Sequence, residues 1–411
     1  MAVPSPSLHH APASGWVNDP LALTWHEDRY HLFFQYVPES TVWTLACRWG
    51  HATSDDLLSW EPAPVALEPG DGDDGVWSGN LVRPADGDPV AFYTAVTESR
   101  LALGRVRRAV PLDAGWTSWR KEEVVVEPPE DDDVLEFRDP FVQPYGEGWR
   151  MLVGGGLASG QGAVWGYESA DLRTWAPLGR LAADADMSAT WECPVLVEVG
   201  GRTVLVVSAL DPGRILHVGY AFVDDHGDRF DLGPWQRLTY GPSLYAASTF
   251  ADAEGEPGLV AWLREVGDAE SGWMGAHSLP VRVRASGDRL VAAPPPVLAA
   301  RRAGPVMEGL LPAVADLEWA PVPGDVLVAE GRCRLDAVGE TVAVTVDAVR
   351  HELPWSGEPL RMVLDGPVLE VFGELGWLAV PVPATGVDGV LTGSTARVRV
   401  HRLSDRGSAL L

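Results

Sequence analysis

The sequence is poor in cysteine and in positive charge. Its 411 residues include only three cysteines, Cys47, Cys193 and Cys333, which are far apart and odd in number, so we expect reduced thiols and no disulfide framework. Lys and Arg total 31 against 58 Asp and Glu, a formal net charge of −27. Because contacts to phosphate need a basic face, this balance argues against a nucleic acid or an anionic membrane as partner.

Membrane, secretion and metal signals are missing as well. No stretch approaches the roughly 20 apolar residues of a membrane span, and the first residues lack a basic segment followed by an apolar one, so we expect a cytoplasmic protein. There is no His and Cys cluster with metal-ligand spacing. The acidic loops 70–75 and 130–133 lack the spacing of a calcium loop. We therefore expect solvated surface at these loops and no metal or other cofactor, while the oligomeric state stays open.

Short β segments fill the first 295 residues. Gly, Pro and Asp cluster between them, and no long stretch keeps a period of 3.6, so this part is expected to be all-β. The clearest expected strands are 30–36, 90–96, 149–154, 162–168, 195–199, 203–209, 216–223 and 259–264.

A repeated turn indicates how these strands are organised. The pattern Ser-x-Asp-Leu-x-x-Trp occurs at residues 54–60 and again at 169–175, each time after an expected strand. Units of similar build favour a β-propeller over a sandwich or a barrel. The 18 tryptophans suit stacked β layers or a surface that binds sugar rings.

Composition changes at the run of three prolines, residues 294–296, which is typical of a stiff linker. We expect a first domain over 1–295, a linker over 296–308 and a second domain over 309–411. The second domain alternates apolar and polar residues in enough segments for a β-sandwich. These segments are 326–329, 340–346, 360–364, 368–372, 377–382 and 396–400.

Three acids lie next to, or two residues before, a proline between expected strands: Asp19, Asp139 and Glu192. Pro20 fixes its own φ and disfavours the helical region for Asp19, so this carboxylate is held by a stiff backbone. Each acid alone has a simpler explanation: a hairpin turn, a salt bridge with Arg138, and a capped strand end. However, cleavage of a glycosidic bond with retention needs two carboxyl groups about 5 Å apart. Three such acids in aromatic contexts therefore predict a sugar-cleaving site.

The local sequence also assigns roles to these acids. Apolar residues around Glu192, in segment 191–197, predict burial, which raises a carboxyl pKa as a general acid requires. Asp19, beside the backbone donors of its turn, is expected to stay ionised and act as the nucleophile. Asp139, held by Arg138, is expected to remain a charged acceptor for sugar hydroxyls.

These motifs resemble glycoside hydrolase family 32, the β-fructofuranosidases. The motifs, in the order and approximate spacing of the family, are Gly-Trp-Val-Asn-Asp-Pro at 15–20, His-Leu-Phe-Phe-Gln-Tyr at 31–36, Trp-Gly-His-Ala at 49–52, Trp-Ser-Gly at 77–79, Phe-Arg-Asp-Pro at 137–140 and Trp-Glu-Cys-Pro at 191–194. Residues 245–250, 273–280 and 362–372 resemble later segments of the family. The resemblance covers nearly the whole chain.

The resemblance implies a five-bladed β-propeller with a funnel-shaped site on its axis, followed by a C-terminal β-sandwich. It implies that Asp19 is the nucleophile, Glu192 the acid/base and Asp139 the stabiliser of the transition state. Carried over position by position, the residues that line the fructosyl pocket are Asn18, Gln35, Trp43, Trp77, Ser78 and Arg138. For Trp43 and Trp77 the alternative is a core role, and His51 is expected to be structural.

Three departures from the family pattern lie near these acids. Leu21 and Ala22 stand where the family usually has Asn-Gly, Val37 replaces an Asn, and Val195 replaces an acid. We expect them to make the rim of the site more apolar, and they leave the preferred fructoside open.

The leading hypothesis is a retaining hydrolase that releases terminal β-fructofuranosyl units from sucrose-like or short fructo-oligosaccharide substrates through a covalent fructosyl-Asp intermediate. A fructosyltransferase is the alternative, with transfer or intramolecular cyclisation as in difructose anhydride metabolism, because the same three acids serve both outcomes. A sugar-binding propeller without catalysis is a further alternative, but all three acids are present. Binding of a phosphorylated sucrose requires Lys or Arg at the mouth of the funnel, and no cluster of such residues lies near the motifs.

Overall fold

The computed structural model describes residues 4–85, 87–131 and 133–404, and its secondary structure is almost entirely β. Within these ranges the helical segments are α1 (Val297–Ala300) and a 3₁₀ turn (Thr395–Arg397). No helix of this described part is both long and apolar enough to cross a membrane. The all-β prediction is confirmed.

The chain up to residue 293 forms five antiparallel meanders and a few short additional strands. The first two meanders are β1 (Gly15–His26), β2 (Arg29–Val37), β3 (Arg48–Ser54), β4 (Glu61–Leu67), and β5 (Gly75–Val82), β6 (Val90–Thr97), β7 (Arg100–Pro111), β8 (Trp119–Val126). The third is β9 (Val134–Tyr145), β10 (Gly148–Leu157), β11 (Gly162–Ser169), β12 (Ala176–Asp184). The fourth and fifth, with the short strands around them, are β13 (Thr190–Val199), β14 (Arg202–Asp211), β15 (Arg214–Asp225), β16 (Phe230–Leu232), β17 (Gln236–Arg237), β18 (Thr239–Tyr240), β19 (Leu244–Ala251), β20 (Pro257–Asp268), β21 (Trp273–His277), β22 (Val281–Ser286), β23 (Arg289–Ala293).

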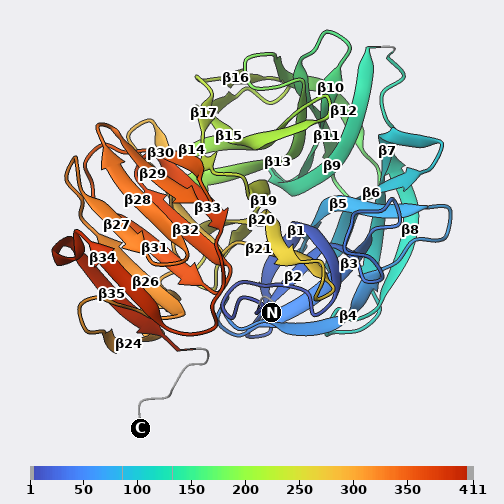
Figure 1. The fold of residues 1–411 in the computed structure, drawn as a ribbon. Coiled ribbons are helices and arrows are strands. Elements are labelled where there is room, and N and C mark those ends of the chain that lie inside the picture. Colours follow the sequence, from blue (N-terminus) through green and yellow to red (C-terminus); the bar gives the residue numbers. More distant parts are fainter. Residues whose placement is uncertain (1–3, 86, 132, 405–411) are drawn as a thin grey trace.

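The first strands of the five meanders, β1, β5, β9, β13 and β19, contact one another in a closed ring. The meanders surround this ring in Figure 1. Strand β21 pairs in parallel with β1 and antiparallel with β20, so main-chain hydrogen bonds join the last meander to the first. The ring brings residues from distant parts of the chain to a common centre.

Each first strand has a β-bulge, where its register with the second strand shifts. The shifts lie between Val17 and Pro20, Val76 and Gly79, Arg138 and Phe141, Glu192 and Val195, and Tyr245 and Ser248. Bulges bend a strand and change the direction of its side chains. Five equivalent bulges in one ring therefore build one site.

The repeated turn found in the sequence has the same geometry in both copies. It joins β3 to β4 and β11 to β12. The carboxylate of Asp56 accepts two backbone N–H bonds, and so does that of Asp171. Asp113 makes a related turn between β7 and β8, where it bonds the N–H of Thr117. The sequence pattern missed this copy because Asp113, Gly115 and Trp116 stand where the others have serine, aspartate and leucine.

Two further sheets follow α1. A seven-stranded sheet has the order β18-β33-β32-β31-β26-β35-β24, and a six-stranded sheet has the order β25-β34-β27-β28-β29-β30. Their strands beyond β18 are β24 (Arg302–Pro305), β25 (Leu310–Leu311), β26 (Val314–Trp319), β27 (Val326–Ala329), β28 (Cys333–Val338), β29 (Thr341–Val346), β30 (Val349–Pro354), β31 (Leu360–Asp365), β32 (Val368–Gly373), β33 (Gly376–Pro381), β34 (Gly389–Gly393) and β35 (Val398–Leu403). One buried apolar cluster takes Leu364 and Val371 from the first sheet and Leu335 and Val344 from the second.

The boundary between the two parts differs from the predicted linker over 296–308. This segment contains α1 and β24, and β24 pairs with β35, so the C-terminal sheet begins inside it. The N-terminal segment also crosses the boundary, since the N–H groups of Ser7, Leu8 and His9 donate to the carboxylate of Asp365. Residues 1–3 and 405–411, the predicted outer ends of the two domains, lie outside the described residues.

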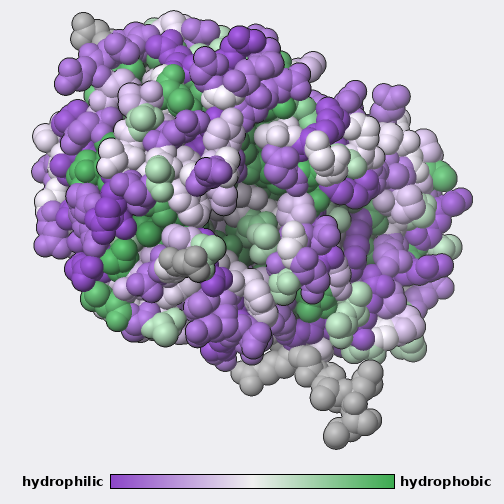
Figure 2. Space-filling model, turned by 180° about the vertical axis from the view of Figure 1, so that it is seen from behind, coloured by the Kyte–Doolittle hydropathy of each residue, from purple (hydrophilic) through white to green (hydrophobic). Residues whose placement is uncertain are grey.

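The acidic loop 70–75 differs from the prediction, which was a solvated surface. Asp73 is 3% exposed, and its carboxylate pairs with Arg107 at 3.0 Å and Lys121 at 3.2 Å. The protein's own cations thus occupy this carboxylate. Asp132 of the second acidic loop lies outside the described residues, and the described part contains no group of three or more His, Cys, Asp or Glu able to hold a metal ion. Hydrophilic side chains cover most of the face in Figure 2.

Candidate active site

The bulges of β1, β9 and β13 hold the three acids that the sequence singled out. Asp19 and Asp139 lie inside their bulges, and Glu192 begins the third. Asp139 has φ 63° and the adjoining Cys193 has φ 46°, in a region that non-glycine residues seldom adopt. Such conformations persist where the surrounding structure holds them, and they concentrate at functional sites.

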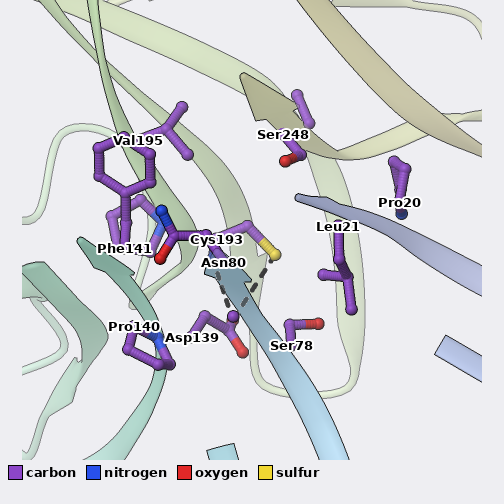
Figure 3. Close-up of a pocket in the computed structure, with 13 residues that line it drawn as sticks. Pro20, Leu21, Ser78, Asn80, Asp139, Pro140, Phe141, Cys193, Val195 and Ser248 are labelled. Carbon is purple, nitrogen blue, oxygen red and sulfur yellow. Dashed lines mark hydrogen bonds between the residues drawn. The ribbon is translucent and has the colours of Figure 1, made fainter. Parts of the chain in front are cut away.

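The two aspartates meet at the side chain of Cys193. Its Sγ lies 3.7 Å from Oδ2 of Asp19 and 3.6 Å from Oδ2 of Asp139. Its backbone N–H donates to Asp139 at 3.0 Å, and Figure 3 shows both contacts to Asp139. The charge of Glu192, the residue before Cys193, helps to raise the pKa of both aspartates, so all three acids belong to one cluster.

Both oxygens of Asp19 accept hydrogen bonds from predicted pocket residues. Gln35 donates to Oδ2 from its Nε2 at 3.1 Å, and Asn18 donates to Oδ1 from its Nδ2 at 3.1 Å. The hydroxyl of Ser78 also donates to Oδ2 and in turn accepts from Gln35. These donors fix the direction in which Asp19 points.

Arg138 pairs with a different acid from the one predicted. Its Nη2 lies 2.8 Å from Oε1 of Glu192 and also pairs with Glu136. Among the described residues it forms no ion pair with Asp139, which takes its hydrogen bonds from Cys193 instead. The prediction paired neighbours in sequence, but the bulge turns their side chains apart.

The surroundings of Glu192 are polar, whereas its sequence neighbours predicted an apolar environment. Besides the pair with Arg138, the hydroxyl of Tyr245 donates to Oε2 of Glu192 at 2.5 Å. The side chain of Glu192 is 19% exposed. Trp191 is completely buried and packs on Trp235 instead, with ring centroids 5.0 Å apart.

Burial changes the ionisation of the other acids. It raises the pKa of Asp19 to about 6; the bond from Ser78 opposes this rise, and the charge of Glu192 adds to it. Burial also raises the pKa of Asp139, against the effect of Arg138. At neutral pH Asp19 is thus mostly ionised. Burial and then Glu192 raise the pKa of Tyr245, so its hydroxyl keeps the proton that it donates.

Indole rings form a wall of the site. Trp43 is 44% exposed and contacts the edge of Trp77, with ring centroids 5.7 Å apart. The guanidinium of Arg138 lies 6.0 Å from the centroid of the Trp77 ring. Trp16 and Trp262 form a second edge contact at 5.5 Å. The exposure of Trp43 argues against a purely core role for it.

A small cavity of about 20 Å³ lies beneath the carboxylates, with room for about one water molecule. Leu21, Phe141 and Val195 line it on its apolar side (Figure 3). Leu21 and Val195, from two of the three departures from the family pattern, therefore lie at the floor of the site. The expectation was that these departures make its rim apolar. Ala22 and Val37 are 5% and 4% exposed and lie in apolar clusters of the core.

Sequence reasoning missed three residues of this cluster: Glu136, Tyr245 and Cys193. The sequence predicted only a reduced thiol at Cys193, whereas this thiol touches two of the acids. Tyr245 occupies the same bulge position in β19 that Arg138 and Glu192 occupy in their strands. Alignment of the five first strands with one another would have pointed to it.

Comparison with known proteins gives the same family as the motifs. Residues 9–294 match the family described as glycosyl hydrolases family 32 N-terminal domain. The chain is 32% identical over 321 residues to a sucrose-6-phosphate hydrolase of Zymomonas mobilis, across 70% of this chain and 61% of that protein. It is 33% identical over 312 residues to a raffinose invertase of Escherichia coli, across 70% of this chain and 64% of that protein. These matches cover less than two thirds of each relative.

Solved structures show the same fold over almost the whole chain. A Bombyx mori GH32 β-fructofuranosidase superposes with a TM-score of 0.84 at 27% identity, over 97% of this chain and 94% of that chain. A sucrose-6-phosphate hydrolase from Lactobacillus gasseri superposes with a TM-score of 0.84 at 21% identity, over 97% of this chain and 93% of that chain. With the family match spanning most of its length, the chain belongs to glycosyl hydrolase family 32.

Proposed function

We propose that the protein is a retaining glycoside hydrolase that releases terminal β-fructofuranosyl units from sucrose-like or short fructo-oligosaccharide substrates. The observation that carries the proposal is the convergence of Asp19 and Asp139 on the thiol of Cys193 at the centre of the strand ring, close enough to Glu192 for its charge to raise the pKa of both aspartates. Family membership supports it, as do the relatives named sucrose-6-phosphate hydrolase and raffinose invertase.

In the first step, a carboxylate oxygen of Asp19 attacks the anomeric carbon of the fructosyl unit. The bond from this carbon to the leaving oxygen breaks, and Glu192 gives its proton to that oxygen. In the second step, Glu192 takes a proton from water, which attacks the same carbon and releases fructose and free Asp19. The donors Gln35 and Ser78 orient Asp19 for the attack.

Asp139 acts on the sugar ring and not on the bond that breaks. We assign it as an acceptor for sugar hydroxyls, whose hydrogen bonds strengthen as the ring approaches an oxocarbenium-like state. The N–H of Cys193 holds this carboxylate in place.

The fructosyl pocket is built from the residues around these acids. Asn18, Gln35 and Ser78 supply polar contacts beside Asp19, and Arg138 supplies them beside Glu192. The indoles of Trp43 and Trp77 offer apolar faces to the sugar ring.

We infer a five-bladed β-propeller followed by a β-sandwich. The closed ring of five first strands supports the propeller, and the apolar cluster shared by the two C-terminal sheets supports the sandwich. The first domain corresponds to 1–295, and the second begins at β24, a few residues before the predicted boundary at 309.

Product analysis tests the proposed activity. The purified protein is incubated with sucrose, short inulin and levan oligomers and difructose anhydrides, and the products are separated by chromatography. Free fructose from the protein, and none from the Asp19→Ala variant, is the expected result. Longer or rearranged sugars would mean fructosyl transfer, and intact substrates throughout would overturn the proposal.

A further inference from the structure

The guanidinium of Arg138 pairs with a second acid, Glu136, in addition to Glu192. Arg138 Nη2 contacts Glu136 as well as Glu192, and the three side chains are 14%, 27% and 19% exposed. Burial raises the pKa of Glu136. The charge of Arg138 opposes this rise, and the charge of Glu192 adds to it. Because Glu192 is proposed to protonate the leaving oxygen, Glu136 lies on the side of the site where the leaving group departs.

The loops around the site entrance carry few Lys and Arg side chains. In antiparallel meanders, the connections from second to third strand, and from one meander to the next, lie at the end where the first strand begins. We call these connections, with one flanking strand residue on each side, the mouth segments. Within their described residues the Lys and Arg side chains are Arg48, Arg100, Arg214 and Arg237. The first three pair with acids of the same segments, namely Glu39, Glu127 and Asp211, and Arg237 lies over the ring of Tyr240.

Other side chains of the entrance are acidic or apolar. Acids of the mouth segments include Glu68, Asp71, Asp74, Glu98, Glu130 and Glu270. The exposed apolar side chains include Val42 at 63% and Trp43 at 44%, both in a mouth segment, and Leu135 at 55%, which directly precedes Glu136. This surface suits a neutral group with an apolar face.

We propose that Glu136 determines specificity by occupying Arg138 and adding negative charge beside Glu192, so that the site accepts a neutral leaving group and rejects a phosphorylated one. This rests on the proposed fructoside hydrolysis. The name of the Zymomonas mobilis relative concerns a phosphorylated sucrose, so the two proteins are expected to differ in substrate.

The physical reason is charge repulsion in a poorly hydrated site. A phosphate monoester carries about −1.5 to −2 charges at pH 7 and is recognised by arginine forks. Here the nearest guanidinium already pairs with Glu136, so a phosphate meets no free cation there and is repelled by the carboxylates of the mouth segments. Repulsion of this kind weakens as salt screens it, with a Debye length of about 10 Å at 0.1 M.

The test compares sucrose with sucrose phosphorylated on its glucosyl O6. The readout is the ratio of kcat/KM for the two substrates, measured for the wild type, Glu136→Gln and Glu147→Gln. Glu147 is a matched control, because it is an exposed acid in the turn at the other end of β9. We expect wild type to prefer sucrose by about tenfold or more, equivalent to about 1.4 kcal/mol. Glu136→Gln is expected to lose most of this preference and Glu147→Gln to keep it.

The ratio is measured again in 0.5 M salt, where the preference of the wild type is expected to shrink. Equal use of both substrates by the wild type, a preference that salt does not change, or a preference that Glu136→Gln does not change, would each overturn the inference and leave the proposed function intact. Failure to cleave either substrate, or any fructan, would overturn the proposed function itself.

Discussion

Replacement of Ser78 by alanine is expected to move the acid limb of the pH profile. Ser78 donates a hydrogen bond to Asp19, and this bond lowers the pKa that burial raises to about 6. A hydrogen bond to a charged group contributes about 1.5–3 kcal/mol, and one pKa unit corresponds to about 1.4 kcal/mol. Loss of the bond therefore raises the pKa of Asp19 by about one to two units. Since Asp19 is proposed to attack as an ionised carboxylate, the limb is expected to move to higher pH.

The measurement is kcat/KM for sucrose between pH 4 and 9, because this parameter follows the ionisation of the free enzyme. Wild type is expected to lose activity as the pH falls through about 6, and Ser78→Ala as it falls through about 7 to 8. Ser248→Ala is the matched control, since Ser248 lines the cavity beneath the carboxylates from β19. An acid limb at the same pH in Ser78→Ala and wild type would refute the reasoning, however far the maximal rate falls.

Three further predictions concern catalysis and stability. Asp19→Ala and Glu192→Ala are each expected to lower kcat on sucrose by about 10³-fold or more with unchanged circular dichroism, and near wild-type turnover in either would contradict the assigned roles. His9 lies between two buried carboxylates, and although burial opposes it, their hydrogen bonds raise its pKa from 6.5 to about 9. This contribution of about 3 kcal/mol to the free energy of unfolding is complete below pH 6.5 and disappears as the pH rises through about 9. The free energies of unfolding of His9→Gln and wild type, measured by chemical denaturation, should therefore converge at high pH. A difference that stays constant with pH would contradict this prediction. Asp73→Asn leaves three cations around an uncharged amide and is expected to lower the free energy of unfolding by about 3 kcal/mol. Asp71→Asn, at an exposed acid, should lower it little. Equal effects of the two variants would contradict the charge argument.

The strands and the family were readable from the sequence because both depend on local patterns. The segment predicted at 326–329 is β27 (Val326–Ala329), and the segment at 90–96 lies within β6 (Val90–Thr97). Alternation of apolar and polar residues marks such strands without any knowledge of their partners. The three acids were found for a similar reason, since each lies in a short motif beside a proline.

The contacts among the site residues were not readable, because they depend on how five bulges meet. Asp139 follows Arg138 in sequence, yet the guanidinium reaches Glu192 in the next meander. Tyr245 lies 53 positions after Glu192 and donates to it. The start of the second domain was missed for the same reason, since β24 becomes a strand only by pairing with β35, far along the chain.

The most direct test of the account traps the sugar on the protein. Glu192→Ala is incubated with a fructosyl donor whose leaving group needs no proton, such as β-fructofuranosyl fluoride, so that the first step proceeds and the second, without its base, is slow. Intact-mass analysis followed by peptide mapping is expected to find one fructosyl group esterified to Asp19. A fructosyl group on another residue, or release of fluoride with no modified protein and inverted product, would contradict the central claim.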